Sequence, residues 1–375
     1  MDYPKDAAII VLKLAMIKRI LILGAGKIAH DHAEAARRLP GPPKIAAADP
    51  SEAALQRLTA AFAEIECYGS VDAMLALPLE GTEVAIVATP PYLHYPHVLA
   101  ALRSGRSILC EKPLTMNAEE LRLLHREAQT RGLHLASCSS RFLGRPSFLE
   151  AKRLFDSPTL GDGLRITWRR RFSAGRSGYE YQPSSRWFLD KGKAGGGCLF
   201  DWGCYDFTTL HALIEPRCVT INDAWLGYPV KGKPLDPGLV FDVETQVCAS
   251  LRYVLRDGRT LHMDYERSTA CFGPEIDLHL IEGDRGALTW DWLDWEGHSV
   301  TRYWDAAGEP HHSTIFCPDV AGLDPMSRPL IQLDAALSGR LRDQCWDADA
   351  AFDHELLCAL YETAADGKVR SLNHE

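Results

Sequence analysis

The segment Arg19-Ile-Leu-Ile-Leu-Gly24-Ala-Gly26-Lys-Ile-Ala29 decides the fold of the first half of the chain. Its apolar run predicts a buried strand, and its two glycines predict a tight turn into a helix. This is the G-x-G-x-x-A form of the dinucleotide-binding fingerprint. Gly24 permits the turn, and Gly26 lets the backbone approach a pyrophosphate. The helix N-terminus that begins at Lys27 and Ile28 would supply N–H donors to the phosphates.

The next predicted strand, residues 44–48, ends at Asp49. A carboxylate at this position accepts hydrogen bonds from an adenosine ribose and repels a 2′-phosphate, which favours NAD over NADP. NADP stays possible. The alternative interpretation is that Asp49 caps the helix that begins near Ser51, and the two roles are compatible.

Strands and helices then alternate, with strands at 83–89, 108–110 and 133–138 and helices at 96–104 and 118–131. This alternation predicts a parallel, doubly wound sheet over residues 16–140. The carboxyl ends of its strands would lie along one edge, where open α/β sheets bind ligands. The candidates for cofactor binding along this edge are Gly24, Gly26, Lys27, Ile28, Asp49, Thr89, Pro90, His94, Glu111 and Lys112.

A charged tripeptide, Glu111-Lys112-Pro113, ends one of these strands. Proline biases the residue before it towards an extended backbone, so Lys112 is expected at the strand tip. A lysine held there can polarise a carbonyl or share a proton with a substrate hydroxyl. The alternative is a solvated lysine at the start of a loop.

The second half, residues 141–375, changes rhythm to alternating strands with turn signals, which predicts a mostly antiparallel sheet. The glycines of 195–197 leave a backbone free of side chains, where a ligand could come close. A helix after them would place Asp201 and Tyr205 on one face as an acid/base pair, or as an ordinary aspartate and a core tyrosine. Trp290, Trp292 and Trp295 form an aromatic patch that suits sheet core or a subunit contact.

The composition narrows the classes of partner. A net charge of −9 over 375 residues argues against a nucleic-acid backbone and against an anionic membrane, and no apolar run is long enough to span a bilayer. Eleven cysteines without a C-x-x-C pair indicate a reducing compartment, the cytoplasm. The first fifteen residues are interpreted as an extension without a catalytic role.

Metal binding and serine hydrolysis are not expected. The pairs His30-x-His32 and His311-His312 have no further ligand at a suitable spacing. The chain also has no G-x-S-x-G elbow.

Together these motifs resemble the Gfo/Idh/MocA oxidoreductase family, over nearly the whole chain from Met16. The matching features are Gly24-Ala-Gly26-Lys-Ile-Ala29, Thr89-Pro90-Pro91-Tyr-Leu-His94, Glu111-Lys112-Pro113, Gly195-Gly-Gly197 with Asp201-x-Gly203-x-Tyr205, and the closing helix from Phe352. The resemblance implies an α/β fold: an N-terminal Rossmann dinucleotide-binding domain plus a C-terminal α+β domain with a large open, mainly antiparallel sheet. It also implies NAD(P)-dependent hydride transfer with a secondary alcohol or ketone of a sugar, sugar derivative or cyclitol.

The resemblance assigns roles to three residues. Tyr205 would exchange the hydroxyl proton, Lys112 would stabilise the oxyanion or lower the pKa of the phenol, and Asp201 would orient the pair. Many members carry an acid where this chain has Thr208, so a role for that carboxylate is not carried over. Tyrosine in place of histidine favours a sugar reductase or dehydrogenase over an inositol dehydrogenase.

Further expectations complete this interpretation. Arg141, Arg186 and Trp187 are candidate substrate contacts. The alternatives are a reductase of an imine or tetrapyrrole, a glycosidase-like member that uses NAD, and a non-catalytic cofactor-binding regulator. The exposed face of the open sheet predicts a homodimer or homotetramer.

Overall fold

The computed structural model describes residues 17–162, 165–173, 185–229, 237–292, 299–318, 324–339 and 348–374. The predicted extension over residues 1–15 lies outside these ranges. Among the helices described, none is long and apolar enough to cross a membrane.

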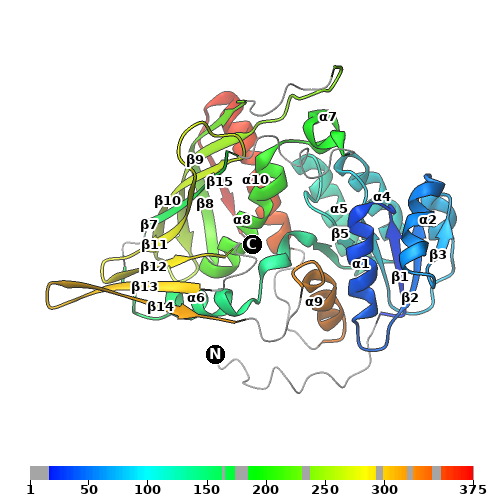
Figure 1. The fold of residues 1–375 in the computed structure, drawn as a ribbon, viewed down its shortest axis with the longest axis horizontal. Helices are drawn as coiled ribbons and strands as arrows, with labels where there is room; N and C mark the ends of the chain where they lie inside the picture. Colours follow the sequence, from blue (N-terminus) through cyan, green and yellow to red (C-terminus); the bar gives the residue numbers. More distant parts are fainter. Residues whose placement is uncertain are drawn as a thin grey trace.

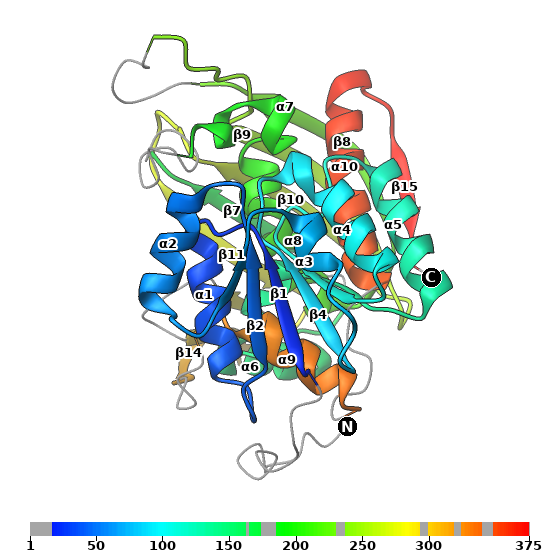
Figure 2. The same cartoon turned by 90° about the vertical axis from the view of Figure 1, so that its right-hand side faces the viewer.

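The first half forms a six-stranded parallel sheet in the order β3-β2-β1-β4-β5-β6, which confirms the predicted Rossmann topology (Figure 2). Its strands are β1 (Arg19–Leu23), β2 (Lys44–Ala48), β3 (Glu66–Tyr68), β4 (Glu83–Val87), β5 (Ser107–Cys110) and β6 (Leu135–Ser137). The intervening helices are α1 (Lys27–Arg37), α2 (Glu52–Ala61), α3 (Val71–Leu75), α4 (His94–Arg103) and α5 (Ala118–Arg131), with short 3₁₀ turns η2 (Pro91–Leu93) and η3 (Cys138–Phe142).

The sequence of β1 shows why this sheet is covered on both faces. Ile20 and Ile22 belong to one hydrophobic cluster, and Leu21 and Leu23 belong to the cluster on the opposite face. Successive side chains of a strand point to opposite faces, so a continuous apolar run suits a strand with helices on both sides.

The second half is built on a nine-stranded sheet in the order β14-β13-β12-β11-β7-β10-β9-β8-β15. Only the β7–β10 pair is parallel, and the other neighbours are antiparallel. Its strands are β7 (Arg165–Arg171), β8 (Pro216–Gly227), β9 (Gln246–Leu255), β10 (Thr260–Ser268), β11 (Ile276–Glu282), β12 (Gly286–Trp290), β13 (Ser299–Ala306), β14 (Glu309–Phe316) and β15 (Arg370–Asn373).

Four of these strands, β8, β13, β14 and β15, were not predicted from the sequence. The alternation of β8 is interrupted by a register shift between Ile221 and Asp223. The hairpin of β13 and β14 extends beyond the rest of the sheet, and Val300 is its only fully buried apolar side chain in the described range. A strand without a buried face carries little period-two signal.

Helices fill the space between the two sheets (Figure 1). The helices of the second half are α6 (Pro146–Asp156), α7 (Lys191–Ala194), α8 (Cys204–Ile214), α9 (Arg328–Leu337) and α10 (Ala348–Asp366), with a 3₁₀ turn η4 (Arg186–Leu189) and a π-helical turn η5 (Leu199–Gly203). Leu330 and Leu333 of α9 join the core of the nucleotide-binding unit beside α1. A late segment of the chain thus packs on the early domain, and the boundary near residue 140 stays a prediction.

The tryptophans of the predicted aromatic patch lie in the core of the second unit. The ring centroid of Trp168 is 6.4 Å from that of Trp290 and 5.8 Å from that of Trp292, and all three side chains are buried. Trp295 lies outside the described residues.

Candidate active site

The glycine turn after β1 has the geometry that a dinucleotide requires. Gly24 adopts φ +100°, and a Cβ there would lie 2.8 Å from the carbonyl oxygen of Ala88. Gly26 is the N-cap of α1, and a Cβ there would meet open space. The N-terminus of α1 has no side-chain cap, whereas Ser51, Ser70 and Asn117 cap α2, α3 and α5. The uncapped N–H groups, from Lys27 and Ile28 onward, fit a pyrophosphate.

Asp49 lies at the carboxyl end of β2, next to this turn. Its carboxylate accepts hydrogen bonds from the backbone N–H of Ala25 at 2.8 Å and of Ser51 at 2.8 Å. The cap of α2 is Ser51, so the alternative interpretation of Asp49 as the helix cap is wrong. Its two backbone contacts fix the carboxylate at the position expected for ribose recognition.

His94 connects the loops that follow β4 and β5. It is fully buried, and its ring nitrogens lie 2.7 Å from the carbonyl oxygens of Thr89 and Pro113. Burial lowers the pKa of His94, although the contacts with the two carbonyls oppose this shift. Pro90, which was also a cofactor candidate, directly precedes η2 at the same edge. His94 therefore joins the loop after β4 to the loop after β5 and stabilises this edge of the sheet.

Lys112 reaches from the tip of β5 into the second unit. Its Nζ donates to the main-chain oxygen of Asp201 at 2.7 Å and to the Asp201 carboxylate. The same ammonium lies 5.2 Å from the ring centroid of Tyr205. The sequence predicted that these three residues converge, and the structure brings them together.

The Tyr205 hydroxyl is contacted by a different cation. Arg141 donates from Nη1 to the phenol oxygen at 2.5 Å and from Nη2 to the Glu111 carboxylate. His32 Nε2 lies 2.8 Å from the same carboxylate. Burial raises the pKa of Tyr205 to about 12, against the opposing effect of Arg141 and then of Lys112.

Arg141 was predicted to contact substrate. The structure places it with 2% of its surface exposed, behind the phenol and against Glu111. Burial alone would raise the pKa of Glu111, but Arg141, His32 and Lys112 hold it well below its usual range. The carboxylate is therefore ionised and balances the guanidinium.

The backbone around Asp201 and Tyr205 is not one regular helix. Asp201 lies in the π-helical turn η5, and Tyr205 is the second residue of α8. The carboxylate contacts Lys112, and the phenol hydroxyl contacts Arg141. The predicted i,i+4 pairing was thus correct in placing both residues at one site, but each has its own cation.

The triple glycine has a different role from the one expected. A Cβ on Gly196 would overlap Tyr361, and a Cβ on Gly197 would overlap the backbone of Glu244. Glu244 accepts hydrogen bonds from the N–H of Gly197 at 2.8 Å and of Leu199 at 3.0 Å. The groups that come close to these glycines are therefore Tyr361 and Glu244 of the protein itself. The hydrogen bonds to Glu244 anchor the start of the helical segment that carries Asp201 and Tyr205.

A possible metal-ligand cluster was missed by the sequence analysis. The ligand atoms of His32, Glu111 and Cys138 lie within 4.8 Å of one another, and all three residues are buried. However, the Arg141 guanidinium already contacts the Glu111 carboxylate. A cation placed there would be repelled, so the cluster fits an ion-pair network better than a metal.

A carboxylate does come close to Thr208, but from a distant element. Asp353 of α10 accepts from Thr208 Oγ1 at 2.6 Å and contacts His211 Nδ1 at 2.6 Å. Burial and the sequence separation of 145 residues hid this contact from the sequence analysis. It ties α8 to α10.

The remaining candidates for substrate contact, Arg186 and Trp187, lie on η4, close to where the second unit contacts the first. Arg186 is exposed on η4, and Trp187 stacks on Phe188 with ring centroids 4.0 Å apart. The following helix, α7, packs against η2 of the nucleotide-binding unit. A substrate contact for Arg186 and Trp187 stays a prediction.

The fold and the glycine turn define the class of dinucleotide-binding proteins. Two family models match the chain: the oxidoreductase family with an NAD-binding Rossmann fold over residues 18–137, and the GFO/IDH/MocA C-terminal domain over residues 148–289. The chain belongs to the Gfo/Idh/MocA family, and its N-terminal unit is the NAD-binding domain of that family.

Curated relatives match parts of the chain. A putative UDP-kanosamine synthase oxidoreductase subunit of Amycolatopsis mediterranei is 33% identical over 178 residues, which are 47% of this chain and 46% of that protein. The scyllo-inositol 2-dehydrogenase (NADP(+)) of Bacillus subtilis is 33% identical over 37% of each chain. The inositol 2-dehydrogenase of Rhizobium meliloti is 25% identical over 73% of this chain and 75% of that protein. The first two matches thus span less than half the length of the relatives.

Solved structures match nearly the whole chain. Levoglucosan dehydrogenase in complex with NADH has a TM-score of 0.76 at 18% identity, covering 95% of this chain and 99% of that chain. GenD2 from gentamicin A biosynthesis, in complex with NAD, has a TM-score of 0.69 at 25% identity, covering 96% and 98%. These similarities confirm the predicted fold of both units.

Proposed function

We propose that this protein is an NAD(P)-dependent oxidoreductase that transfers hydride between nicotinamide and a secondary alcohol or ketone of a sugar, sugar derivative or cyclitol. The observation that carries the proposal is the convergence of Lys112 and Tyr205 at the carboxyl end of β5. That edge also carries the uncapped glycine turn. Relatives named as inositol dehydrogenases support the substrate class.

The proton chemistry is assigned to this chain's own residues. A bound nicotinamide would accept or deliver the hydride. For reduction, Tyr205 gives its phenol proton to the substrate oxygen, and Lys112 stabilises negative charge that develops on that oxygen. Asp201 holds the ammonium in place through two contacts. Oxidation uses the same groups in reverse.

The proposed cofactor preference is NAD over NADP. The Asp49 carboxylate is fixed at the end of β2 by two backbone N–H groups, and a 2′-phosphate would meet its negative charge. Because the Bacillus subtilis relative is named for NADP(+), both cofactors belong in the assay.

The proposal is tested by screening sugars, cyclitols and their keto forms for absorbance change with NAD(H) and NADP(H). Turnover of at least one polyol or its ketone is expected. Tight NADH binding without turnover of any of them would favour the non-catalytic regulator. Cleavage of a glycoside without net NADH formation would favour the glycosidase-like alternative, and turnover of imines alone would favour the non-sugar reductase.

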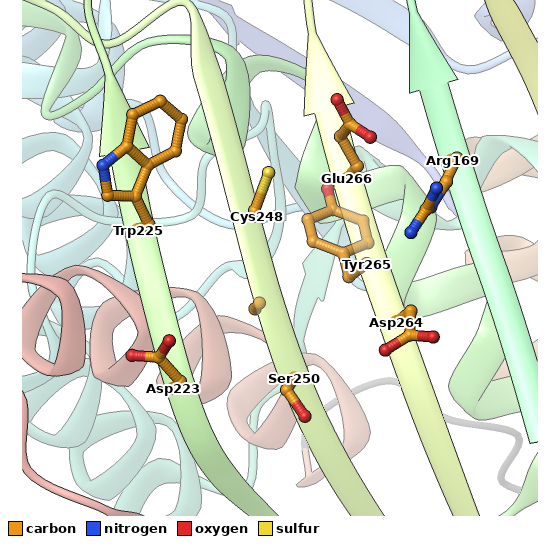
Figure 3. A pocket seen from close by; sticks show the side chains of 9 residues that line it. Arg169, Asp223, Trp225, Cys248, Ser250, Asp264, Tyr265 and Glu266 are labelled. Carbon is orange, nitrogen blue, oxygen red and sulfur yellow. The ribbon is translucent and has the colours of Figure 1, made fainter.

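We also propose a homodimer or homotetramer formed through the outer face of the large sheet. On that face, Arg169, Trp225, Cys248 and Glu266 surround a hollow of about 230 Å³ (Figure 3), and Trp225 is 52% exposed. An exposed tryptophan beside a hollow suits a protein contact. Light scattering should give a molar mass of two or four times 41.6 kDa. The Trp225→Glu substitution should lower this molar mass. A monomeric wild type would reject the proposal.

The proposed location is the reducing cytoplasm. Nine cysteines of the described ranges, among them Cys110, Cys138, Cys198 and Cys204, are free thiols. Unpaired thiols persist where glutathione and thioredoxin keep them reduced.

A further inference from the structure

We infer that Arg141 is a positioning residue that aims the Tyr205 proton at the substrate, and that Glu111 and His32 hold Arg141 in place for this task. The inference rests on the proposed function and adds a mechanism for this chain's tyrosine. It comes from a line of four buried side chains drawn from η3, α8, α1 and the loop after β5.

The hydrogen-bond chemistry sets the direction of the phenol proton. A guanidinium has only N–H donors, so Arg141 must donate to the phenol oxygen and cannot accept from it. The single O–H of Tyr205 therefore points away from Arg141. Lys112, also a donor, lies above the ring at 5.2 Å from its centroid. The proton is left to a group that can accept it, such as a ketone oxygen.

The charges support the same assignment. When the phenol O–H bond breaks and the proton bonds to the substrate oxygen, a phenolate remains on Tyr205. Its nearest cation is Arg141, at 2.5 Å, whereas Lys112 is already paired with Asp201. The other ionisable groups that face the phenol are Glu111 and Cys204. Arg141, more than Lys112, would therefore stabilise the phenolate.

Glu111 and His32 keep this guanidinium fixed. The Glu111 carboxylate accepts a hydrogen bond from Arg141 and also contacts His32 of α1. The carboxylate is therefore held between the guanidinium and the imidazole. Asp31 and Cys138 also face Arg141 or Glu111. A guanidinium whose two terminal nitrogens donate to the phenol and to Glu111 cannot swing away from the phenol, which keeps the direction of the phenol proton constant.

A double-mutant cycle on kcat tests the inference, with the polyol or ketone found in the screen as substrate. The variants are Arg141→Met, Tyr205→Phe and their combination. Arg141→Met should lower kcat by about ten- to a hundredfold with KM changed by less than about threefold. In the Tyr205→Phe background, the same substitution should lower kcat by less than about threefold, because Arg141 acts through the phenol.

Controls separate positioning from folding. Arg106, buried and paired with Glu83 at 2.8 Å, is the matched arginine outside the site. Arg106→Met should lower the melting temperature and leave kcat unchanged. If Arg141→Met does not fold, Glu111→Gln combined with Arg141→Met removes both charges and takes its place in the cycle.

The outcomes distinguish the inference from the proposed function. Multiplicative losses in the double variant would overturn the inference and leave the function standing. A normal kcat for Arg141→Met would do the same. A wild type that turns over no polyol or ketone would remove the proposed function, and the inference with it.

Discussion

The two halves of the candidate site are built in different ways. The dinucleotide half is made of backbone: a glycine at φ +100°, an open glycine N-cap and the free N–H groups of α1, all within one short segment. The half that we propose to be catalytic is made of side chains that come from distant parts of the chain. Lys112 and Asp201 are 89 residues apart, and Arg141 and Tyr205 are 64 apart.

This difference has a physical consequence. A backbone site needs only the correct local conformation, and substitution there acts on cofactor affinity. A site of buried, mutually paired charges needs every member, because removal of one leaves another buried charge uncompensated. Mutations in the two halves should therefore affect different quantities, kcat in one half and cofactor affinity in the other. The size of the effect should differ as well.

The largest effect is expected in the catalytic half. Lys112→Met should lower kcat by about 10²- to 10⁴-fold, because the substrate oxyanion loses its cation. NADH affinity, measured by fluorescence titration, should change by less than about threefold. The surface Lys193, paired with Asp190 at 2.9 Å, provides the control: Lys193→Met should retain wild-type kcat. Equal losses in kcat and NADH affinity would contradict the division into two halves.

The pH dependence gives the next largest effect. Burial raises the pKa of Tyr205 to about 12, so between pH 7 and 9 the phenol is almost entirely protonated. Reduction uses the protonated phenol, and its kcat/KM should be flat over this range. Oxidation uses the phenolate, whose fraction rises about tenfold per pH unit, so its kcat/KM should rise about a hundredfold.

The control for this profile is Tyr205→Phe, which should lose the slope for oxidation. A flat oxidation profile in the wild type would show that Tyr205 is not the proton acceptor. Both directions are followed at 340 nm with saturating cofactor.

The same contrast explains how much could be predicted from the sequence. The glycine turn and Asp49 follow from local spacing, and the predicted helix over 118–131 is confirmed, ending at Gly132 with a left-handed φ of +63°. Lys112, Asp201 and Tyr205 were placed at one site because the family motifs carry them.

What the sequence could not supply were the pairings. Arg141 was predicted to contact substrate, and only the fold shows that its guanidinium lies between Glu111 and the phenol of Tyr205. Glu244 and Asp353 gave no signal, since single buried carboxylates have no period or motif. Long-range side-chain partners depend on packing that local pattern does not encode.

The smallest expected effect, and the sharpest test of the backbone half, uses its two glycines as a matched pair. Gly26 has φ −71° and open space where a Cβ would lie, so Gly26→Ala should leave the melting temperature within about 1 °C of wild type. The added methyl group would occupy the path of the pyrophosphate and weaken NADH binding at least about tenfold.

Gly24→Ala must instead adopt φ +100° beside the carbonyl of Ala88, so it should destabilise the fold by about 1–3 kcal/mol. Calorimetry and NADH titration on both variants separate the two roles: affinity lost without stability at Gly26, and stability lost at Gly24. If Gly26→Ala bound NADH as well as the wild type does, the pyrophosphate could not lie against this turn, and the uncapped end of α1 would need another explanation.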